Sequence, residues 1–455
     1  MRILLTVHQF LPDFHGGTEI LTFHTAKALL ARGHEVSVCT SFPPRAGLDD
    51  AHRFDRYTYD GIPVERFHHG HAPMGGETNV AALEYNNPFF AAYFRDYLIK
   101  TRPDVVHFFH LLRFSASAID VCHELGIPMV LTPTDFWLVC PTIQLLLPNH
   151  ALCPGPDPDG VNCLRHVVAL TQSPLARVCL DMIPNRLVAA MIRGINIGVF
   201  PRQKKASSVR ALSARPRFMK SRMNRVDRII VPTRLMEDIL RKNGLINETK
   251  VTFLPFGINL DGLSQKGPSS SQARLRIGFI GTLYEHKGAH LLLKAVRSLS
   301  TDTPIEVKIY GNTNEFPEYA ARLRKIASND PRIEFCGTFP NSHIGDVFSS
   351  LDVLVVPSIW YENTPLVIYS AQACGCPVIA SDLGGMSEAV AHEENGLLFE
   401  AGNVSALAQA ISRLAGDRTL LRKLAEQARK PKAIAHYAVE LENVYKEILT
   451  ERRTA

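Results

Sequence analysis

Two short stretches in the second half of the sequence place a charged side chain at the start of a helix. Lys287 and Gly288 follow a predicted strand at 276–280 and precede an apolar-periodic helix. Because a lysine at a helix start opposes the helix dipole, an anionic ligand would explain its position. An exposed surface lysine would explain it equally well. Glu362 precedes another helix, where a carboxylate could accept hydrogen bonds from the hydroxyls of a sugar.

The stretch around Glu362, PSIWYENTPLVIYSAQACGCPVIASDLGG (357–385), is dense in turn signals. Thr364 is a favoured capping residue and Pro365 a favoured first helical residue, so we expect the helix to begin there. Glycine and proline at 375–377 end that helix, and a strand at 378–380 follows. Glu362 is therefore predicted to lie in a loop between a strand and a helix.

The first loop of the chain also leads into a helix. Gly16 and Gly17 lie between a buried strand at 3–7 and an amphipathic helix at 18–32, which we expect Thr18 to cap. Glycines let the backbone approach a ligand closely, and a helix start offers free N–H donors. A plain turn between a strand and a helix needs a glycine about as often.

These loops connect two series of alternating strands and helices. The first series has predicted strands at 3–7, 35–40, 64–67, 105–109, 128–132 and 228–231, and the second at 276–280, 306–310, 333–336, 353–356 and 378–380. Such alternation is typical of a parallel sheet covered by helices on both faces. We divide the chain into a domain at 1–260 with an insertion at 140–225, a linker at 261–273, a domain at 274–430 and a last helix at 431–455. Two doubly wound domains would bind ligands at the carboxyl ends of their strands.

Five stretches together resemble retaining glycosyltransferase family 4. They are the Gly16–Gly17 loop, DVVHFFHLL at 104–112, the pair Lys287–Gly288, YENTPLVIYSAQACGCPVIASDLGG at 361–385, and NGLLF at 395–399. The resemblance implies an α/β protein of GT-B architecture, with two Rossmann-like doubly wound parallel-sheet domains facing across a cleft. It also implies a last helix that crosses back to the first domain.

The resemblance implies an enzyme that moves a sugar from a UDP- or GDP-sugar, with retention of configuration. The acceptor would be lipid-linked or a polysaccharide, in cell-envelope glycan biosynthesis. By position, Lys287 would neutralise the donor diphosphate, Glu362 would bind the hydroxyls of the transferred sugar, and Gly16 and Gly17 would close over the phosphates. Backbone N–H groups of one loop would meet the leaving phosphate, so that catalysis needs no metal cofactor. That loop consists of Asn363, Thr364, Pro365 and Leu366.

Three positions depart from the family pattern. Ser370 stands where the family has a second glutamate that binds the nucleotide ribose, a loss of about 1.5 to 3 kcal/mol in donor binding. Thr282 stands where an arginine is usual. The family also has a histidine near the transferred sugar. One way of aligning the sequence places Phe109 at that position, which leaves His110 or His107 as the candidate. These departures keep a second hypothesis open, a catalytically impaired sugar-nucleotide-binding subunit of a glycan-assembly complex. A dinucleotide-dependent oxidoreductase is disfavoured because the first loop lacks G-x-G-x-x-G.

A cysteine-rich loop forms a separate candidate site. Cys140, Cys153 and Cys163 are followed by His166, a set that could bind a structural zinc ion. The twelve residues between the first two cysteines are unlike a compact zinc motif, so free thiols are an equal alternative and a disulfide a lesser one.

Composition and charge indicate a globular protein with a basic region. The 455 residues carry a net charge of +6, and 186–228 holds twelve Lys or Arg against one acid. Such a block suits an anionic partner such as a membrane surface. A solvated face is the plainer interpretation. Nucleic acid is disfavoured because only Phe200 and Phe218 are available in that block to stack on bases. With no signal peptide and no run of about 18 apolar residues, we expect a cytoplasmic protein that could bind the inner membrane face.

Overall fold

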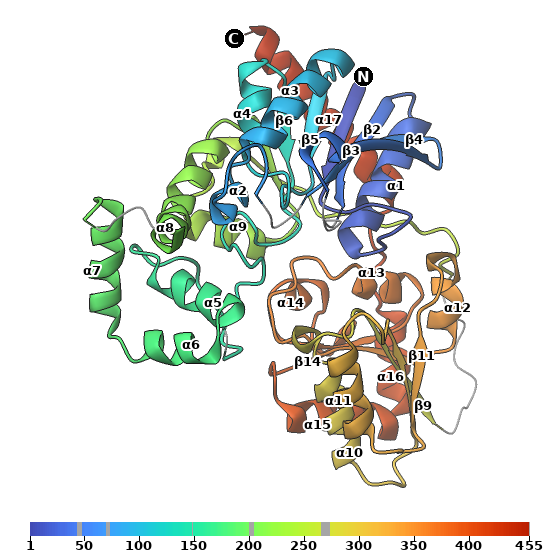
Figure 1. Cartoon of the computed structure of the whole chain (residues 1–455). Helices are drawn as coiled ribbons and strands as arrows, with labels where there is room; N and C mark the ends of the chain where they lie inside the picture. The colour runs from blue at the N-terminus through green and yellow to red at the C-terminus, as the bar shows by residue number, and fades with distance from the viewer. Residues whose placement is uncertain (43–47, 70–72, 148, 200–203, 265–273, 455) are drawn as a thin grey trace. The chain divides into compact units, whose positions relative to one another are not determined.

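The computed structural model describes residues 1–42, 48–69, 73–147, 149–199, 204–264 and 274–454 (Figure 1). The chain divides into two compact units. One consists of Met1–Pro255 together with Ala435–Ala455, and the other of Phe256–Ile434. Most of the predicted linker, residues 265–273, lies outside the described residues.

The first unit is built on an eight-stranded sheet of order β3-β4-β2-β1-β5-β6-β7-β8. Every neighbouring pair is parallel except the hairpin of β3 and β4 at one edge. The strands are β1 (Arg2–Val7), β2 (Glu35–Phe42), β3 (Phe54–Tyr59), β4 (Ile62–His68), β5 (Val105–Phe108), β6 (Met129–Leu131), β7 (Arg228–Val231) and β8 (Val251–Phe253). The central strands are apolar and buried, as expected of a parallel sheet covered on both faces.

Helices follow most strands of this sheet, and four of them come between β6 and β7. The helices of this unit are α1 (Gly17–Ala31), α2 (Val80–Leu83), α3 (Pro88–Thr101), α4 (Ser117–Glu124), α5 (Val161–Thr171), α6 (Pro174–Asp181), α7 (Asn185–Asn196), α8 (Lys204–Met223), α9 (Arg234–Lys242) and α17 (Ile434–Thr454). The last helix, α17, packs on the first unit although the second unit precedes it in sequence. Its Tyr445 hydroxyl lies 2.6 Å from Nδ1 of His107 on β5, and Arg452 pairs with Asp227 at 2.9 Å.

The second unit contains a six-stranded sheet of order β11-β10-β9-β12-β13-β14, parallel throughout. Its strands are β9 (Leu275–Ile280), β10 (Ile305–Tyr310), β11 (Ile333–Gly337), β12 (Val353–Val356), β13 (Val378–Ser381) and β14 (Gly396–Phe399). Its helices are α10 (Ala289–Ser298), α11 (Pro317–Ala327), α12 (Ile344–Ser349), α13 (Leu366–Ala373), α14 (Gly385–Ala389), α15 (Val404–Gly416) and α16 (Arg418–Glu426).

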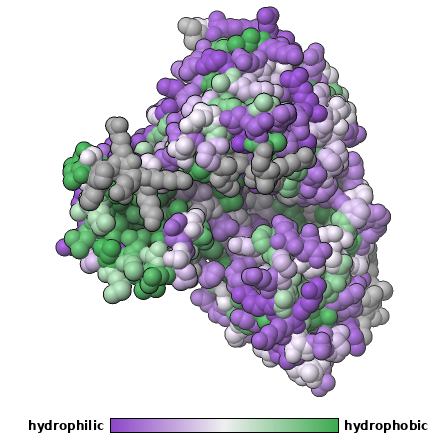
Figure 2. All heavy atoms as spheres, in the orientation of Figure 1, coloured by the Kyte–Doolittle hydropathy of each residue, from purple (hydrophilic) through white to green (hydrophobic). Residues whose placement is uncertain are grey.

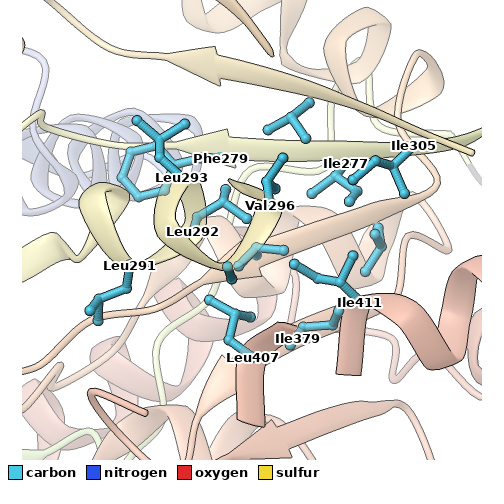
Figure 3. Packing of buried hydrophobic residues seen from close by; sticks show 14 of the residues in the cluster. Ile277, Phe279, Leu291, Leu292, Leu293, Val296, Ile305, Ile379, Leu407 and Ile411 are labelled. Atoms are coloured by element: carbon cyan, nitrogen blue, oxygen red, sulfur yellow. The ribbon is translucent and has the colours of Figure 1, made fainter. Parts of the chain in front are cut away.

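Two hydrophobic clusters cover the two faces of this second sheet. On one face, Phe279 of β9, Leu292 of α10 and Ile411 of α15 pack together (Figure 3). On the other face, residues of α12, α13 and α14 form a separate cluster. Neighbouring residues of β13 divide between them, since Ile379 joins the first cluster and Val378 the second. The sheet is therefore doubly wound, and both faces are withdrawn from water.

Two predicted helix starts are wrong by one or two residues. Helix α1 begins at Gly17, with Gly16 in extended conformation as its N-cap, so Thr18 lies inside the helix. Helix α13 begins at Leu366, because ψ of 89° places Pro365 outside the helix as its N-cap. Thr364 therefore does not cap it, and its hydroxyl is buried without a hydrogen-bond partner in the described part of the chain. No described helix is long and apolar enough to cross a membrane.

Candidate functional site

The strand order of the second unit points to one place for a ligand. The order reverses between β9 and β12, and ligands of doubly wound sheets bind outside the carboxyl ends of the strands at such a point. Lys287 ends a short 3-10 helix, Glu285–Lys287, in the loop after β9, and Glu362 lies in the loop after β12. The structure brings these two predicted residues together, with 2.7 Å between Nζ of Lys287 and Oε1 of Glu362.

Glu362 lies in a dense network of donors. The hydroxyl of Ser358 and the indole N–H of Trp360 both donate to its Oε1 at 2.8 Å, beside the Lys287 ammonium. The residue is only 8% exposed. Burial by itself would raise the pKa of Glu362, but the charge of Lys287 and the three hydrogen bonds outweigh it and lower the pKa. The group is therefore an ionised carboxylate, and its Oε2 accepts none of these three bonds.

Lys287 is held from two sides while part of its side chain stays accessible. Its Nζ lies 5.1 Å from the centre of the Trp360 ring, and its side chain is 27% exposed. The His286 ring packs on the same indole, with centroids 4.3 Å apart. Burial, aided by the Lys287 charge, lowers the pKa of His286 to about 3, so this imidazole is neutral. The loops after β9 and β12 thus offer one cation and one carboxylate.

Two glycines let the loops approach this closely. Gly288 has φ +75°, and a Cβ there would lie 1.9 Å from the carbonyl oxygen of Pro357. A Cβ on Gly385 would lie 2.0 Å from the carbonyl oxygen of Asn363, and the Gly385 N–H donates to the carbonyl of Glu362 at 2.8 Å. A side chain at either position would collide with the backbone, so only glycine allows the loops that carry Lys287 and Glu362 to lie this close together.

The remaining predicted residues of this unit lie on the same loops. Asn363 is buried, and Pro365 and Leu366 form the start of α13. Ser370 lies one turn further along α13 and donates its hydroxyl to the carbonyl of Leu366 at 3.2 Å. Thr282 is exposed in the loop after β9. Their contacts with a nucleotide stay a prediction.

The first unit has a second polar cluster at its own strand reversal, between β1 and β5. His110 follows β5, and its Nδ1 accepts the N–H of Leu112 at 2.9 Å. The proton must then be on Nε2, which lies 2.6 Å from the carboxylate of Asp135. The ring of His8, the first residue after β1, lies 4.3 Å from the His110 ring. His110 is thus held in one tautomer by Asp135.

The two candidate histidines have different environments. His107 is buried within β5, and both ring nitrogens have partners, the hydroxyls of Tyr445 and Thr132. Burial lowers its pKa to about 3. His107 is therefore a neutral core residue, and His110 is the candidate at the strand end.

The glycine loop of the first unit leads directly into the same cluster. Gly16 caps α1 and Gly17 begins it, and Glu19 lies in the first turn. Oε1 of Glu19 is 3.6 Å from Nε2 of His8. Burial raises the pKa of Glu19 and lowers that of His8 well below its usual value, with the charges of His110 and Arg113 adding to the latter. Contact of the glycines with phosphates stays a prediction.

Several residues of the two clusters were not singled out from the sequence. In the second unit these are Ser358, Trp360 and His286, and in the first unit His8, Glu19 and Asp135. Trp360 and Ser358 lie in the same turn-rich stretch as Glu362, and His8 directly follows a predicted strand. Position after a strand would have found His8, whereas Asp135 is recognisable only by its contact with His110.

The cysteine set lines one small pocket. Cys140, Cys153, Cys163 and His166 all contribute to its wall. Cys140 pairs with the Thr142 hydroxyl at 3.1 Å, and burial raises the pKa of Cys163 to about 12. None of the nine cysteines forms a disulfide. Among the described residues, no group of three or more His, Cys, Asp or Glu is arranged to hold a metal ion, so zinc stays a prediction.

The basic stretch at 186–228 is not one continuous cationic face. The structure describes the side chains of nine of its twelve cations, and five of these nine form ion pairs with acids elsewhere in the first unit. These pairs are Arg193 with Asp159, Arg215 with Glu84, Arg222 and Arg225 with Asp120, and Arg228 with Glu447 and Glu451. Phe218 is also used internally, since it packs on Tyr85 and beneath Arg222. Charge alone therefore supports a membrane contact less than the sequence suggested.

Solved structures share this architecture. The chain matches sucrose-phosphate synthase from Thermosynechococcus elongatus with TM-score 0.66 and 19% identity over 99% of both chains. It matches Anabaena HepE (Alr3699), solved in complex with UDP-glucose, with TM-score 0.62 and 16% identity over 98% of this chain and 100% of that one. The predicted class, α/β with two Rossmann-like parallel-sheet domains of GT-B type, is confirmed. A cleft between the domains stays a prediction.

Sequence comparison gives the family. Residues 15–177 match the model of Glycosyltransferase Family 4, and residues 274–417 match that of Glycosyl transferases group 1. Each unit thus carries a glycosyltransferase domain, and the chain belongs to this family.

Curated relatives match over a part of their length. The D-inositol 3-phosphate glycosyltransferase of Corynebacterium urealyticum is 33% identical over 36% of this chain and 40% of its own. YtcC of Bacillus subtilis is 33% identical over 38% of this chain and 46% of its own. The chain thus spans less than half the length of these relatives.

Proposed function

We propose that the protein transfers a sugar from a UDP- or GDP-sugar to a lipid-linked or polysaccharide acceptor, with retention of configuration. The observation that carries the proposal is the Lys287–Glu362 pair, a cation and an ionised carboxylate 2.7 Å apart at the strand reversal of the second sheet. A pyrophosphate requires a cation, and sugar hydroxyls require acceptors. A nucleotide diphosphate sugar presents both groups in one molecule.

The chemistry follows from these groups. Lys287 would offset the charge of the diphosphate, and Oε2 of Glu362 would accept hydrogen bonds from the transferred sugar. As the bond from the anomeric carbon to the phosphate oxygen breaks, charge grows on the leaving phosphate, where fixed dipoles of the Asn363–Leu366 loop would stabilise it. That phosphate would take the proton of the acceptor hydroxyl, which attacks the same face of the sugar. No step here requires a metal ion.

His110 is proposed as the residue of the first unit that contacts the transferred sugar or the acceptor. Both ring nitrogens of His110 have partners, the Asp135 carboxylate at 2.6 Å and the Leu112 N–H, so a hydroxyl that accepts the Nε2–H would have to replace Asp135. The acceptor class is supported by the names of similar proteins. They include WaaG, a glycosyltransferase of lipopolysaccharide biosynthesis that matches with TM-score 0.58, and an exopolysaccharide phosphotransferase of Streptomyces coelicolor that is 31% identical over 30% of this chain. We place the reaction at the cytoplasmic membrane face, in cell-envelope glycan synthesis.

A non-catalytic sugar-nucleotide-binding subunit is the second candidate. Ser370 bonds within its own helix, where a ribose-binding acid would stand, and Thr282 is uncharged. Both hypotheses predict donor binding, and turnover separates them.

The test is a panel of UDP- and GDP-sugars, screened by thermal shift and then assayed for hydrolysis or transfer. For an enzyme, we expect one donor to be consumed and Glu362→Ala to abolish consumption. Glu318→Ala, which removes an exposed carboxylate of α11, should leave the rate unchanged. Binding without turnover for every donor would favour the subunit, and absence of both would refute the proposal.

A further inference from the structure

Helices α5, α6 and α7 present a large apolar surface to solvent. Of the twelve exposed large hydrophobic residues in the described part of the chain, eight lie within this one stretch, and each is 47% to 80% exposed. Figure 2 shows hydrophobic side chains gathered over these helices. The residues are Leu170, Leu175, Val178, Met182, Leu187, Met191, Ile197 and Val199, and we call them the apolar surface. Scattered single hydrophobic residues are ordinary, but a contiguous patch of this kind marks a contact with another apolar phase.

The same helices already have an internal core on their other side. Val188 and Ile192 of α7 are buried against Val161 of α5, with Leu180 of α6 partly buried beside them. The apolar surface is therefore separate from the hydrophobic core of these helices, which lies on their other side. On α7, Val188 and Ile192 lie inward, whereas Leu187 and Met191, one turn apart, lie outward. A helix that is apolar on both sides needs apolar material on both sides.

Charge around the apolar surface has one predominant sign. Residues 161–199 contain four arginines and a single acid, Asp181. Arg186 is exposed on α7 next to the outward apolar residues, whereas Arg177, also exposed on α6, lies 3.7 Å from the carboxylate of Asp181. Arg165 instead ties the three helices together by donating to the carbonyls of Leu180 and Ile183. The apolar surface is thus held by a fixed frame and edged by cations.

We propose that the apolar surface inserts into the interface of a lipid bilayer that carries anionic headgroups. Aliphatic side chains edged by arginine fit acyl chains beneath phosphate groups, the arrangement of helices that lie in a membrane interface. The exposure and charge of these helices support a lipid partner independently of the proposed function. That it brings a lipid-linked acceptor to the enzyme rests on the proposed function.

Flotation of the full chain with vesicles tests the proposal. We expect binding to vesicles of equal parts phosphatidylcholine and phosphatidylglycerol, and weaker binding to phosphatidylcholine alone. Leu187→Asp combined with Met191→Asp should weaken binding by about a hundredfold or more, because two buried side chains are lost from the acyl region. Ile99→Asp is the matched control, since Ile99 is a similarly exposed hydrophobic residue on α3, outside the apolar surface. Arg186→Glu should weaken binding to the anionic vesicles only.

Three outcomes would overturn the proposal. One is absence of binding to both vesicles, and another is equal binding by the double variant and the wild-type chain. The third is a wild-type chain that forms a dimer in light scattering and does not bind vesicles, together with a double variant that is monomeric. That result would assign the apolar surface to a second copy of the chain. Thermal shift with the donor serves as a separate readout: a double variant that keeps its donor response but loses vesicle binding retains its fold and its donor binding, so the loss is specific to the membrane contact.

Discussion

Separating the roles of Lys287 and Glu362 gives the sharpest prediction. The carboxylate lies 2.7 Å from the ammonium, so it both holds Lys287 in place and opposes any anion that Lys287 attracts. Glu362→Gln removes the negative charge and keeps the shape, whereas Lys287→Met removes the cation. UDP carries the diphosphate without a sugar, and a UDP- or GDP-sugar carries both. Comparing the two ligands therefore isolates each contact.

The magnitudes follow from hydrogen bonds to charged groups, worth about 1.5 to 3 kcal/mol each, or roughly tenfold to a hundredfold in affinity. Lys287→Met should weaken the nucleoside diphosphate and its sugar conjugate alike by this factor. Glu362→Gln should weaken the sugar conjugate by a similar factor and leave the nucleoside diphosphate unchanged or tighter. The Lys287 variant should also show a smaller dependence of affinity on salt.

Isothermal titration of both ligands against both variants measures the difference. Glu318→Gln, on an exposed helix face, is the control for a general loss of charge. If Glu362→Gln weakened the nucleoside diphosphate as much as its sugar conjugate, Glu362 would act through Lys287 or the fold, and its proposed contact with the sugar would be wrong.

Four further predictions concern other parts of the chain. Ser370→Glu restores a ribose-binding acid on α13 and should tighten UDP or GDP by about tenfold or more, and unchanged affinity in titration would refute the ribose argument. Gly288→Ala should cost about 2 to 4 kcal/mol and lower the melting temperature sharply because of its φ and its contact with backbone, whereas Gly402→Ala, with φ +81° but open space, should cost about 1 kcal/mol; equal losses would contradict the close-approach argument. If the cysteine set binds zinc, elemental analysis of the purified protein should give one equivalent of zinc, which Cys163→Ser removes. A protein that contains no zinc and is fully stable would favour free thiols instead. Lys446 and Arg32 lower the pKa of Glu442 on α17 from 4.5 to about 2. The contribution of Glu442 to the stability of the docked helix should therefore be complete above pH 4.5 and be lost as the pH falls toward 2. Hydrogen exchange of α17 measures this, and protection that does not change with pH over this range would count against it.

The strands that the sequence predicted are those with strong apolar character. Runs such as 3–7, 105–109 and 353–356 are buried on both faces in a parallel sheet, so almost every residue is apolar. The edge strand β3 was missed because exposed and half-buried residues alternate along it. A signal was present in the sequence, because Asp-Gly is a typical two-residue hairpin turn. In the structure, Asp60 and Gly61 form this turn to β4, both with positive φ. The stretch NGLLF at 395–399 is not among the predicted strands, although Gly396–Phe399 pairs with β13 as β14.

The candidate site was predictable where chemistry and position coincide. Lys287 and Glu362 each lie between a strand and a helix, so their meeting follows from strand order. Contacts that depend on side-chain direction were not predictable, such as the three donors on one oxygen of Glu362 and the Asp135 partner of His110. The apolar surface also required the structure, because only packing shows which side of α7 is already buried.

The most direct measurement for the central claim is a crystal structure of the protein soaked with the nucleotide sugar that gives the largest thermal shift. We expect the diphosphate to lie within hydrogen-bond distance of Lys287 Nζ and a sugar hydroxyl within that distance of Glu362 Oε2. A nucleotide sugar bound elsewhere, with the Lys287–Glu362 pair undisturbed and distant from it, would show that these two residues do not bind the donor.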